Sequence, residues 1–314
     1  MSVSQMMLPR QFSHGASPLY PPPVTLSVVI ITHNEEANIG RTLESVRPLV
    51  SDGKGEIIVV DSGSTDRTVE IAKSFGAKVF VEEWKGYAAQ KNSAIDKATG
   101  DWILSLDADE ELDLDLQRSL SDTLESLQRV DDLGQQENAH ELTVLDARSD
   151  LEYHIGVKLN SDFRGLWIPR KNEFLGRWVR HGGFWPDPKL RFLQRGSGRF
   201  EDRAVHEDIR LSGKASKIRY GGLIHHSYPT LSDYIDHMNR YSSLGAEMVV
   251  AKANGKVRFS VINIVLRPLA TFVYNYFFRL GFLDGREGLL LHLYHAVYVS
   301  WKYAKAWELS RKQQ

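Results

Sequence analysis

The sequence predicts an α/β fold in which helices flank a mostly parallel sheet, followed by a helical C-terminal extension. Over the first 112 residues, short β-branched apolar runs alternate with segments of helical spacing, and each apolar run ends in polar or acidic residues. Beyond residue 230, a helical segment at 231–253 precedes an apolar and aromatic stretch at 257–307.

The first elements illustrate the pattern. The run LSVVIIT at 26–32 is apolar throughout, which is typical of a strand buried on both faces. Apolar residues at Ile39, Leu43 and Val46 predict a helix within 34–50, with Asn34 as its N-cap. The alternation continues with predicted strands at 56–60, 78–81 and 102–106, and predicted helices at 66–75 and 87–98. Ligands bind such sheets beyond the carboxyl ends of the strands.

Composition narrows the class of protein. Of 314 residues, 42% are hydrophobic and 25% charged, which is ordinary for a globular protein. Lys and Arg together number 39 and Asp and Glu 40, so no general charge excess points to nucleic acid. The absence of cysteine excludes disulfides, thiolate zinc sites and cysteine nucleophiles. We expect residues 1–24 to form a flexible tail without a secretion signal.

An acidic triplet, Asp107-Ala108-Asp109, follows the 102–106 strand. If the strand continues through it, both carboxylates point to the same side. Two carboxylates at the open end of a sheet suit Mg²⁺ or Mn²⁺. A solvated acidic turn is the alternative for the triplet alone, but its position after a buried strand favours the cation.

Two further polar clusters follow earlier strands. In the 61–66 turn, Asp61 could accept hydrogen bonds from a base or ribose, and Gly63 lets the backbone approach a ligand. The same residues could also form a simple capped turn. Glu35 or Glu36 could hold a nucleoside, or could only complement the dipole of the helix that follows.

Four runs in order, LSVVIITHNEEANI, EIIVVDSGSTDRT, AQKNSAI and GDWILSLDADEEL, resemble the nucleotide-sugar domain of family 2 glycosyltransferases, which have the GT-A fold. The resemblance implies that Asp61 lies near the base or ribose, and that Lys91 contacts the nucleotide. It also implies that Asp107 and Asp109 hold the diphosphate through Mg²⁺ or Mn²⁺. Glu35 or Glu36 would line the donor pocket.

The second half resembles the lipopolysaccharide core β-glucosyltransferase (WaaE-like) branch of that family. The runs that carry this resemblance are FLGRWVRHGGFWPDPKLRFLQRGSGRF, VHED, HHSYPTLSDYI and GFLDGREGLLL. It implies an inverting transfer of a hexose from a UDP-glucose-like donor to a saccharide hydroxyl of lipopolysaccharide core or a related cell-envelope glycan.

An inverting transfer needs a general base opposite the departing diphosphate. The resemblance favours Glu207, with Asp208 as second choice. The alternative is that these acids only pair with Arg203 or Arg210 at the surface.

Four other residues are candidates for the site. Arg191 could face the diphosphate or a phosphorylated acceptor, or could be ordinary surface charge. Trp185 could stack on a sugar and Asp187 could hold an acceptor hydroxyl, although a packed core tryptophan fits equally. His225 could add a metal ligand, but a lone histidine is more often structural.

We therefore expect a GT-A catalytic domain at 25–230, with a nucleotide-sugar half at 25–112 and an acceptor half at 165–230, and a helical extension at 231–314. Apolar runs of about eight to fourteen residues in this extension fall short of the roughly 20 that span a bilayer. Its aromatic segments, such as Tyr274 to Phe278, predict either an interfacial amphipathic helix or a helical pair packed on the catalytic domain. The first case implies a cytoplasmic protein in peripheral contact with the inner membrane.

Other classes of protein fit less well. A nicotinamide dehydrogenase needs G-x-G-x-x-G after the first strand, where this chain has Thr-His-Asn-Glu-Glu. A non-catalytic binding protein on the same fold and a polyprenyl-phosphate glycosyltransferase remain as alternatives.

Overall fold

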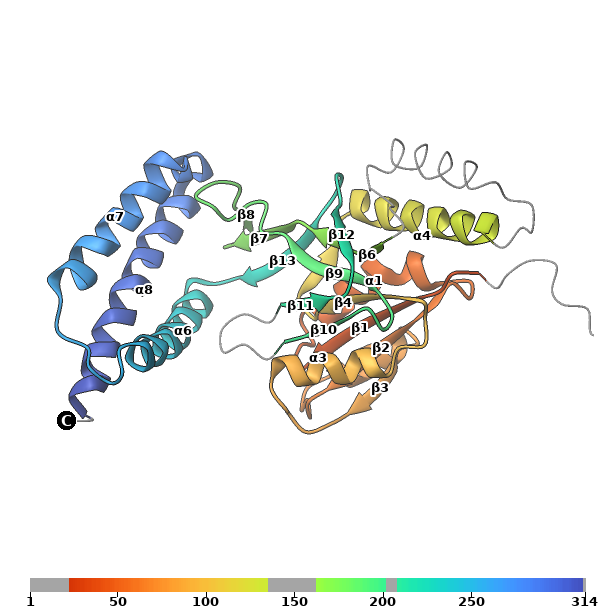
Figure 1. Ribbon diagram of the computed structural model, residues 1–314, viewed down its shortest axis with the longest axis horizontal. Coiled ribbons are helices and arrows are strands. Elements are labelled where there is room, and N and C mark those ends of the chain that lie inside the picture. Colours follow the sequence, from red (N-terminus) through yellow and green to blue (C-terminus); the bar gives the residue numbers. More distant parts are fainter. Residues whose placement is uncertain (1–22, 135–161, 202–207, 313–314) are drawn as a thin grey trace, which may run out of the picture.

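The computed structural model describes residues 23–134, 162–201 and 208–312. Its centre is a seven-stranded sheet of order β12-β6-β9-β4-β1-β2-β3 (Figure 1). Neighbouring strands are parallel except where β9 pairs with β4 and β6. The strands are β1 (Leu26–Thr32), β2 (Gly55–Asp61), β3 (Lys78–Val81), β4 (Trp102–Asp107), β6 (Phe163–Ile168), β9 (Lys189–Gln194) and β12 (Lys214–Lys217). The predicted α/β class with a mostly parallel sheet is confirmed.

Helices cover both faces of this sheet. Alternate residues of β1 enter different cores, because successive side chains of a strand point to opposite faces. Val28 and Ile30 pack with helices α1 and α4, whereas Val29 packs with α3. All three side chains are buried, as predicted for a strand covered on both sides. The helices of this part are α1 (Ile39–Val50), α2 (Thr68–Ser74), α3 (Tyr87–Asp96) and α4 (Leu114–Gly134).

Two smaller sheets extend the central one. A four-stranded sheet has the order β5-β13-β7-β8, and β10 pairs with β11. Because β5 follows β4 after a two-residue turn, the four-stranded sheet begins directly beside the acidic triplet. The strands are β5 (Glu110–Leu112), β7 (Arg170–Phe174), β8 (Arg177–Trp178), β10 (Gly198–Phe200), β11 (Ile209–Leu211) and β13 (Leu223–Tyr228).

The C-terminal helices lie together at one end of the molecule (Figure 1). Helix α6 (Leu231–Lys252) begins at a capping box formed by Thr230 and Asp233, and it packs along α8 (Gly285–Lys312). Along the chain between α6 and α8, helix α7 (Arg267–Val273) is flanked by two π-helical turns, Ile262–Leu266 and Tyr274–Phe278. In the described part of the chain, no helix is long and apolar enough to cross a membrane.

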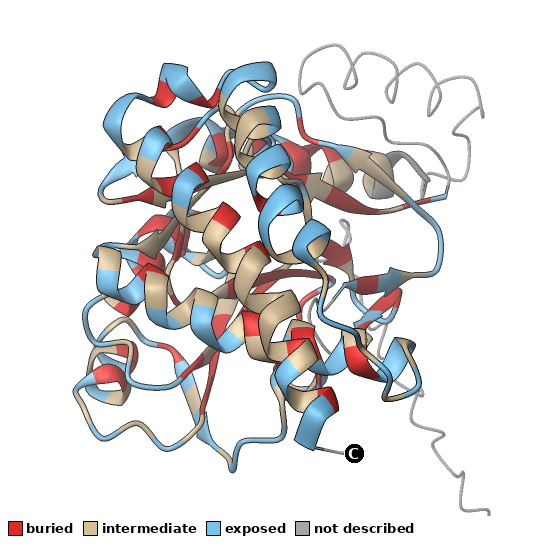
Figure 2. Ribbon diagram, turned by 90° about the vertical axis from the view of Figure 1, so that its left-hand side faces the viewer, coloured by how far each residue is buried: buried red, intermediate tan, exposed pale blue. Residues whose placement is uncertain are grey.

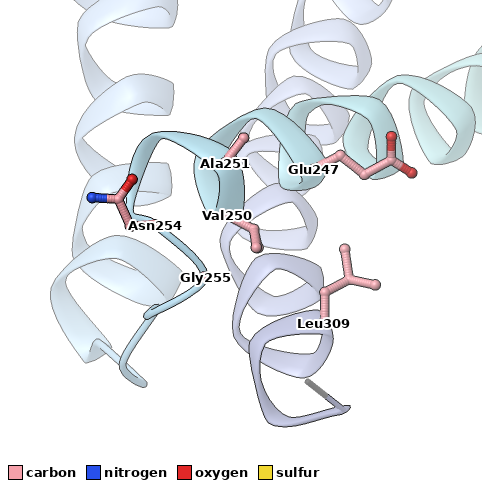
Figure 3. Close-up of a pocket in the computed structure, with 6 residues that line it drawn as sticks. All are labelled: Glu247, Val250, Ala251, Asn254, Gly255 and Leu309. Atoms are coloured by element: carbon pink, nitrogen blue, oxygen red, sulfur yellow. The ribbon is translucent and has the colours of Figure 1, made fainter. Parts of the chain in front are cut away.

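Buried residues concentrate in the strands and on the inner sides of the helices, while the outer turns of the helices are exposed (Figure 2). A pocket opens where the end of α6 meets α8 (Figure 3). None of its lining residues belongs to the polar clusters at the strand ends. The pocket is lined by Glu247, Val250, Ala251, Asn254, Gly255 and Leu309.

Candidate functional site

The parallel register brings the polar strand ends to one edge of the sheet. Thr32 pairs with Asp61 across β1 and β2, and Ile31 pairs with Asp107 across β1 and β4. The three clusters that the sequence singles out therefore lie side by side, where parallel sheets bind ligands.

Asp61 shapes the loop after β2. Its buried carboxylate accepts hydrogen bonds from the Thr32 hydroxyl at 2.9 Å, from the backbone N–H groups of Gly63 and Ser64 at 2.9 and 2.8 Å, and from the Ser64 hydroxyl. These four donors match the roughly four acceptor positions of a carboxylate. A ribose hydroxyl would have to replace one of them, and the Ser64 and Thr32 hydroxyls are the two that a side-chain rotation can release.

The first two strand-end loops are joined by side chains. Asn34 is not the N-cap that the sequence predicts, because α1 begins five residues later. Asn34 instead adopts a left-handed conformation with φ of 55°, and its side-chain oxygen accepts a hydrogen bond from the Thr65 N–H at 2.8 Å. Glu36 accepts from the Arg67 N–H at 3.0 Å and donates its own N–H to Asp66 at 3.1 Å. Glu36 therefore holds the two loops together.

Glu35 differs from its neighbour because it is half-buried beside the acidic triplet. Burial raises its pKa above the ordinary value, although a hydrogen bond from Asn38 opposes the shift. The negative charges of Asp109, Asp66 and Asp107 raise this pKa further. Of the two glutamates that the sequence leaves open, Glu35 is the one whose pKa is raised by the charges of Asp109 and Asp107.

Asp107 lies between two buried cations. One carboxylate oxygen is 2.8 Å from Lys91 Nζ and the other is 2.6 Å from Arg191 Nη2. Burial opposes the ionisation of Asp107, but Arg191 and Lys91 outweigh it and hold its pKa well below the usual range. The same Arg191 nitrogen donates to Glu110 at 2.8 Å, and Glu110 is fully buried.

Asp109 points to a different partner. Strand β4 ends at Asp107, and Ala108 and Asp109 form a turn, so the condition for placing both carboxylates on one side of a strand is not met. The Asp109 carboxylate lies 3.2 Å from His225 Nε2 on β13. The other ring nitrogen of His225 lies 2.8 Å from the side-chain oxygen of Asn172. Burial opposes the ionisation of Asp109, but His225 lowers its pKa.

This arrangement decides which residues fit a metal ion. Both oxygens of Asp107 already face cations, whereas an Asp109 oxygen and a His225 nitrogen lie 3.2 Å apart, close enough for one ion to contact both. When His225 Nδ1 carries the proton and donates it to Asn172, Nε2 offers its lone pair on the side of Asp109, as in many metal-bound histidines. Within the described residues no three acidic or histidine side chains form a ready-made metal cluster. The donor set thus fits a divalent cation that takes its other ligands from phosphate and water.

An ion-pair chain extends from this point toward the predicted acceptor residues. Arg170 lies 3.4 Å from Glu110 and 2.8 Å from Asp187, and Lys189 lies 3.0 Å from Asp187. Burial alone would raise the pKa of Asp187, but Arg170 and the hydrogen bond from Asn172 lower it to about 2. Asp187 is therefore an ionised, partly exposed carboxylate held in one place.

Two residues of these ion pairs, Glu110 and Arg170, are not identified as site residues by sequence reasoning. Glu110 directly follows the acidic triplet and would be taken for another solvated acid, and Arg170 belongs to no motif. The available signal is the three-residue spacing of Glu110 from Asp107, because Glu110 also accepts a hydrogen bond from the Asp107 N–H at 3.1 Å.

The remaining predicted residues are Trp185 and Asp208, which the structure describes, and Glu207, which it does not. Trp185 is half-buried and meets Trp178 edge-on, with ring centroids 5.0 Å apart. Glu207, the favoured base, lies outside the described residues. Asp208 is exposed just before β11, and its backbone oxygen accepts a hydrogen bond from the Glu201 N–H at 3.0 Å. The assignment of the base stays a prediction.

The fold and the strand-end residues define a class, the nucleotide-sugar glycosyltransferases. The model of the family described as "Glycosyl transferase family 2" matches residues 27–173. An uncharacterized glycosyltransferase of Rickettsia typhi is 31% identical over 290 residues, covering 92% of this chain and 89% of that protein. The chain belongs to glycosyltransferase family 2, and it is an enzyme.

Two more distant similarities complete the comparison. The lipopolysaccharide core biosynthesis glycosyltransferase LpsC of Rhizobium meliloti is 28% identical over 293 residues, covering 91% of this chain and 93% of that protein. The solved mannosyltransferase PcManGT from Pyrobaculum calidifontis, in complex with GDP-Man and Mn²⁺, is 15% identical. The match covers 93% of this chain and 74% of that one, with a TM-score of 0.45.

Proposed function

We propose that this enzyme transfers a hexose, with inversion, from a UDP-glucose-like donor to a saccharide hydroxyl of lipopolysaccharide core or a related envelope glycan. The observation that carries the donor half is the grouping of Asp107 with Lys91 and Arg191, next to Asp109 with His225. The acceptor half is supported by the similarity to LpsC over nearly the whole of both chains.

In this proposal, Asp109 and His225 would hold a divalent cation, Mn²⁺ or Mg²⁺, which would supply positive charge to stabilise the departing diphosphate. Lys91 and Arg191 keep Asp107 ionised and fix its orientation toward the donor. The buried position of these cations lets them act with little screening by water.

The transfer itself forms one bond and breaks one. The acceptor oxygen bonds to the anomeric carbon as the bond from that carbon to the diphosphate oxygen breaks. The acceptor proton passes to a carboxylate, for which Glu207 is the first candidate and Asp208 the second. Asp187, ionised and fixed by Arg170, is suited to accept a hydrogen bond from another acceptor hydroxyl, with Trp185 nearby in the chain as a stacking surface.

The pair at the proposed metal position has a matched control. His226 is the neighbour of His225, but its ring nitrogens contact Glu173 at 2.8 Å and Glu111 at 3.2 Å instead of Asp109. Calorimetric titration with UDP should show Mn²⁺-dependent binding in the wild type and in His226→Ala. His225→Ala and Asp109→Ala should lose this dependence. Manganese-dependent UDP binding that survives in both of these variants would disprove the assignment.

The donor and acceptor are tested by activity. A hydrolysis screen of UDP- and GDP-sugars with Mn²⁺ identifies the donor, with Asp109→Ala as the inactive control. Labelled donor is then offered separately to a core saccharide and to polyprenyl phosphate. Transfer to polyprenyl phosphate alone would replace the proposed acceptor class with the lipid one. A lipid-anchored core saccharide would place the reaction at the cytoplasmic face of the inner membrane.

A further inference from the structure

Exposed apolar side chains concentrate in one segment of the C-terminal helices. Among the described residues, 22 large apolar side chains are exposed, and 12 of them fall between residues 259 and 283. Single exposed apolar residues are normal on a protein surface, but a contiguous group marks an interaction site. The most exposed members of this group, the 259–283 surface, are Ile262, Leu269, Tyr274 and Phe278.

The other side of this segment is already occupied by α8. Pro268 is buried, and the Ser300 hydroxyl donates to the Ile264 carbonyl at 2.8 Å. Phe272 and Tyr276 are half-buried and stack on each other with centroids 5.2 Å apart. The aromatic residues that the sequence groups together are thus divided between a packed side and an exposed side. The exposed side is therefore not the side that packs on α8.

Within the segment that carries this surface, the exposed charges have one sign. Between residues 252 and 286 every basic side chain is exposed, and the single acid, Asp284, is 2% exposed. The Asp284 carboxylate already has partners inside the protein. It accepts hydrogen bonds from the backbone N–H groups of Arg180 and His181 at 3.1 and 2.8 Å, and it contacts the His181 ring. The six basic residues are Lys252, Lys256, Arg258, Arg267, Arg279 and Arg286.

This local excess is notable in a chain with a formal net charge of −1. Apolar side chains surrounded by exposed Lys and Arg match the interface of a bilayer that contains anionic lipids. A second copy of the chain fits less well, because a two-fold contact would bring the same basic residues together.

We propose that the 259–283 surface docks this enzyme on an anionic membrane, with α7 and its π-helical turns lying in the plane of the headgroups. If the enzyme acts at the cytoplasmic face of the inner membrane, this surface is the part that contacts the bilayer, and anionic lipids are the ones it binds. Membrane docking depends on these exposed side chains and not on the sugar-nucleotide site. The docking proposal and the donor-site proposal can therefore fail separately.

The docking surface is also connected to the predicted acceptor loop. The Gly182 N–H donates to the Arg279 carbonyl at 2.9 Å, in addition to the contacts of residues 180 and 181 with Asp284. This stretch leads directly to Trp185 and Asp187. A protein lying on a bilayer through this surface would therefore hold its acceptor loop at a defined position relative to an acceptor anchored in that bilayer.

Flotation with lipid vesicles tests the proposal. The full chain should float with vesicles of phosphatidylethanolamine and phosphatidylglycerol, and less with phosphatidylcholine alone. The double variant Phe277→Ser/Phe278→Ser should lose binding at least about tenfold, because both rings are more than half exposed and would insert. Lys256→Gln/Arg258→Gln should lose about fivefold per residue, and salt should weaken wild-type binding.

A matched control removes exposed apolar residues elsewhere. Leu114→Ser/Tyr220→Ser alters side chains that are 67% and 56% exposed near the start of α4, and it should bind vesicles like the wild type. Equal losses in both double variants, or no preference for anionic vesicles, would overturn the proposal. So would a solution dimer, measured by light scattering, that dissociates in Phe277→Ser/Phe278→Ser without any vesicle binding. Manganese-dependent UDP binding, measured on the same variants, separates this outcome from failure of the donor site.

Discussion

Replacing Arg191 with methionine should destabilise the fold by about 3 kcal/mol at neutral pH. Arg191 is only 4% exposed, and its Nη2 contacts both Asp107 and Glu110. Methionine has a similar length but no charge, so the two carboxylates would face each other across an apolar chain. Removing one partner of a buried ion pair typically costs about 3–5 kcal/mol.

Two features set the expected loss of unfolding free energy in Arg191→Met. A carboxyl group can escape repulsion by taking a proton, and at pH 7 this costs about 4 kcal/mol for an ordinary pKa. Lys91 still contacts Asp107 at 2.8 Å, and Arg170 lies 3.4 Å from Glu110, so part of the compensation remains. The loss should therefore lie at the lower end of the range, which is still a large share of a typical total stability of about 5–15 kcal/mol.

Urea unfolding followed by circular dichroism measures this loss. The control is Arg199→Met, because Arg199 forms a two-point pair with Asp96 at 2.7 and 2.9 Å, but both side chains are more than half exposed. Such surface pairs contribute at most about 1 kcal/mol. If Arg191→Met cost no more than Arg199→Met, the buried network would not hold the strand end in place.

The pH dependence gives a second check on the same variant. In the wild type the pKa of Asp107 is lowered, so its stabilising contribution is present above the unfolded-state pKa near 4 and disappears as pH falls through the folded-state pKa. The difference between wild type and Arg191→Met should be largest at neutral pH and should shrink below about pH 4, because protonated carboxyls no longer repel.

Three further outcomes are expected. Gly182→Ala should lower the melting temperature much more than Gly176→Ala, since both glycines have positive φ but only the Gly182 Cβ would meet another side chain, at 1.9 Å from His292. Glu56→Gln should flatten the loss of stability between about pH 4.5 and 2, because burial of Glu56 is outweighed by hydrogen bonds that lower its pKa to about 2; an unchanged acid unfolding curve would contradict this. Glu207→Gln should reduce transfer on the order of 10²–10⁴-fold with UDP binding unchanged, and undiminished transfer would clear Glu207 of the base role.

Elements that depend on local sequence patterns lie where those patterns predict them, whereas contacts between distant segments do not follow from the patterns. The strands and helices of the first half are where the apolar patterns predict them, with ends that coincide or shift by at most two residues, except that α1 begins five residues after the predicted start. The N-cap at Asn34 is the exception. Asn34 makes the polar contact of a capping residue, but with the neighbouring loop at Thr65 instead of with its own helix. No pattern within one segment can distinguish these two partners.

The acidic triplet illustrates the same limit. The sequence places Asp107 and Asp109 at a strand end, but their directions depend on where β4 stops and β5 begins. The pairing of β5 with β13 then brings His225 beside Asp109, and β9 brings Arg191 beside Asp107. These partners come from strands far along the chain.

The sequence by itself determined the fold class, the family, the edge of the sheet that carries the polar groups and the apolar character of the C-terminal helices. These properties follow from residue patterns within single segments and from their order. Only the tertiary structure decided that Lys91 and Arg191 enclose Asp107, that the triplet's charges act on the half-buried Glu35, and which side of the 259–283 segment is exposed. Those outcomes depend on strand pairing and helix packing between distant segments, which set the direction of each side chain.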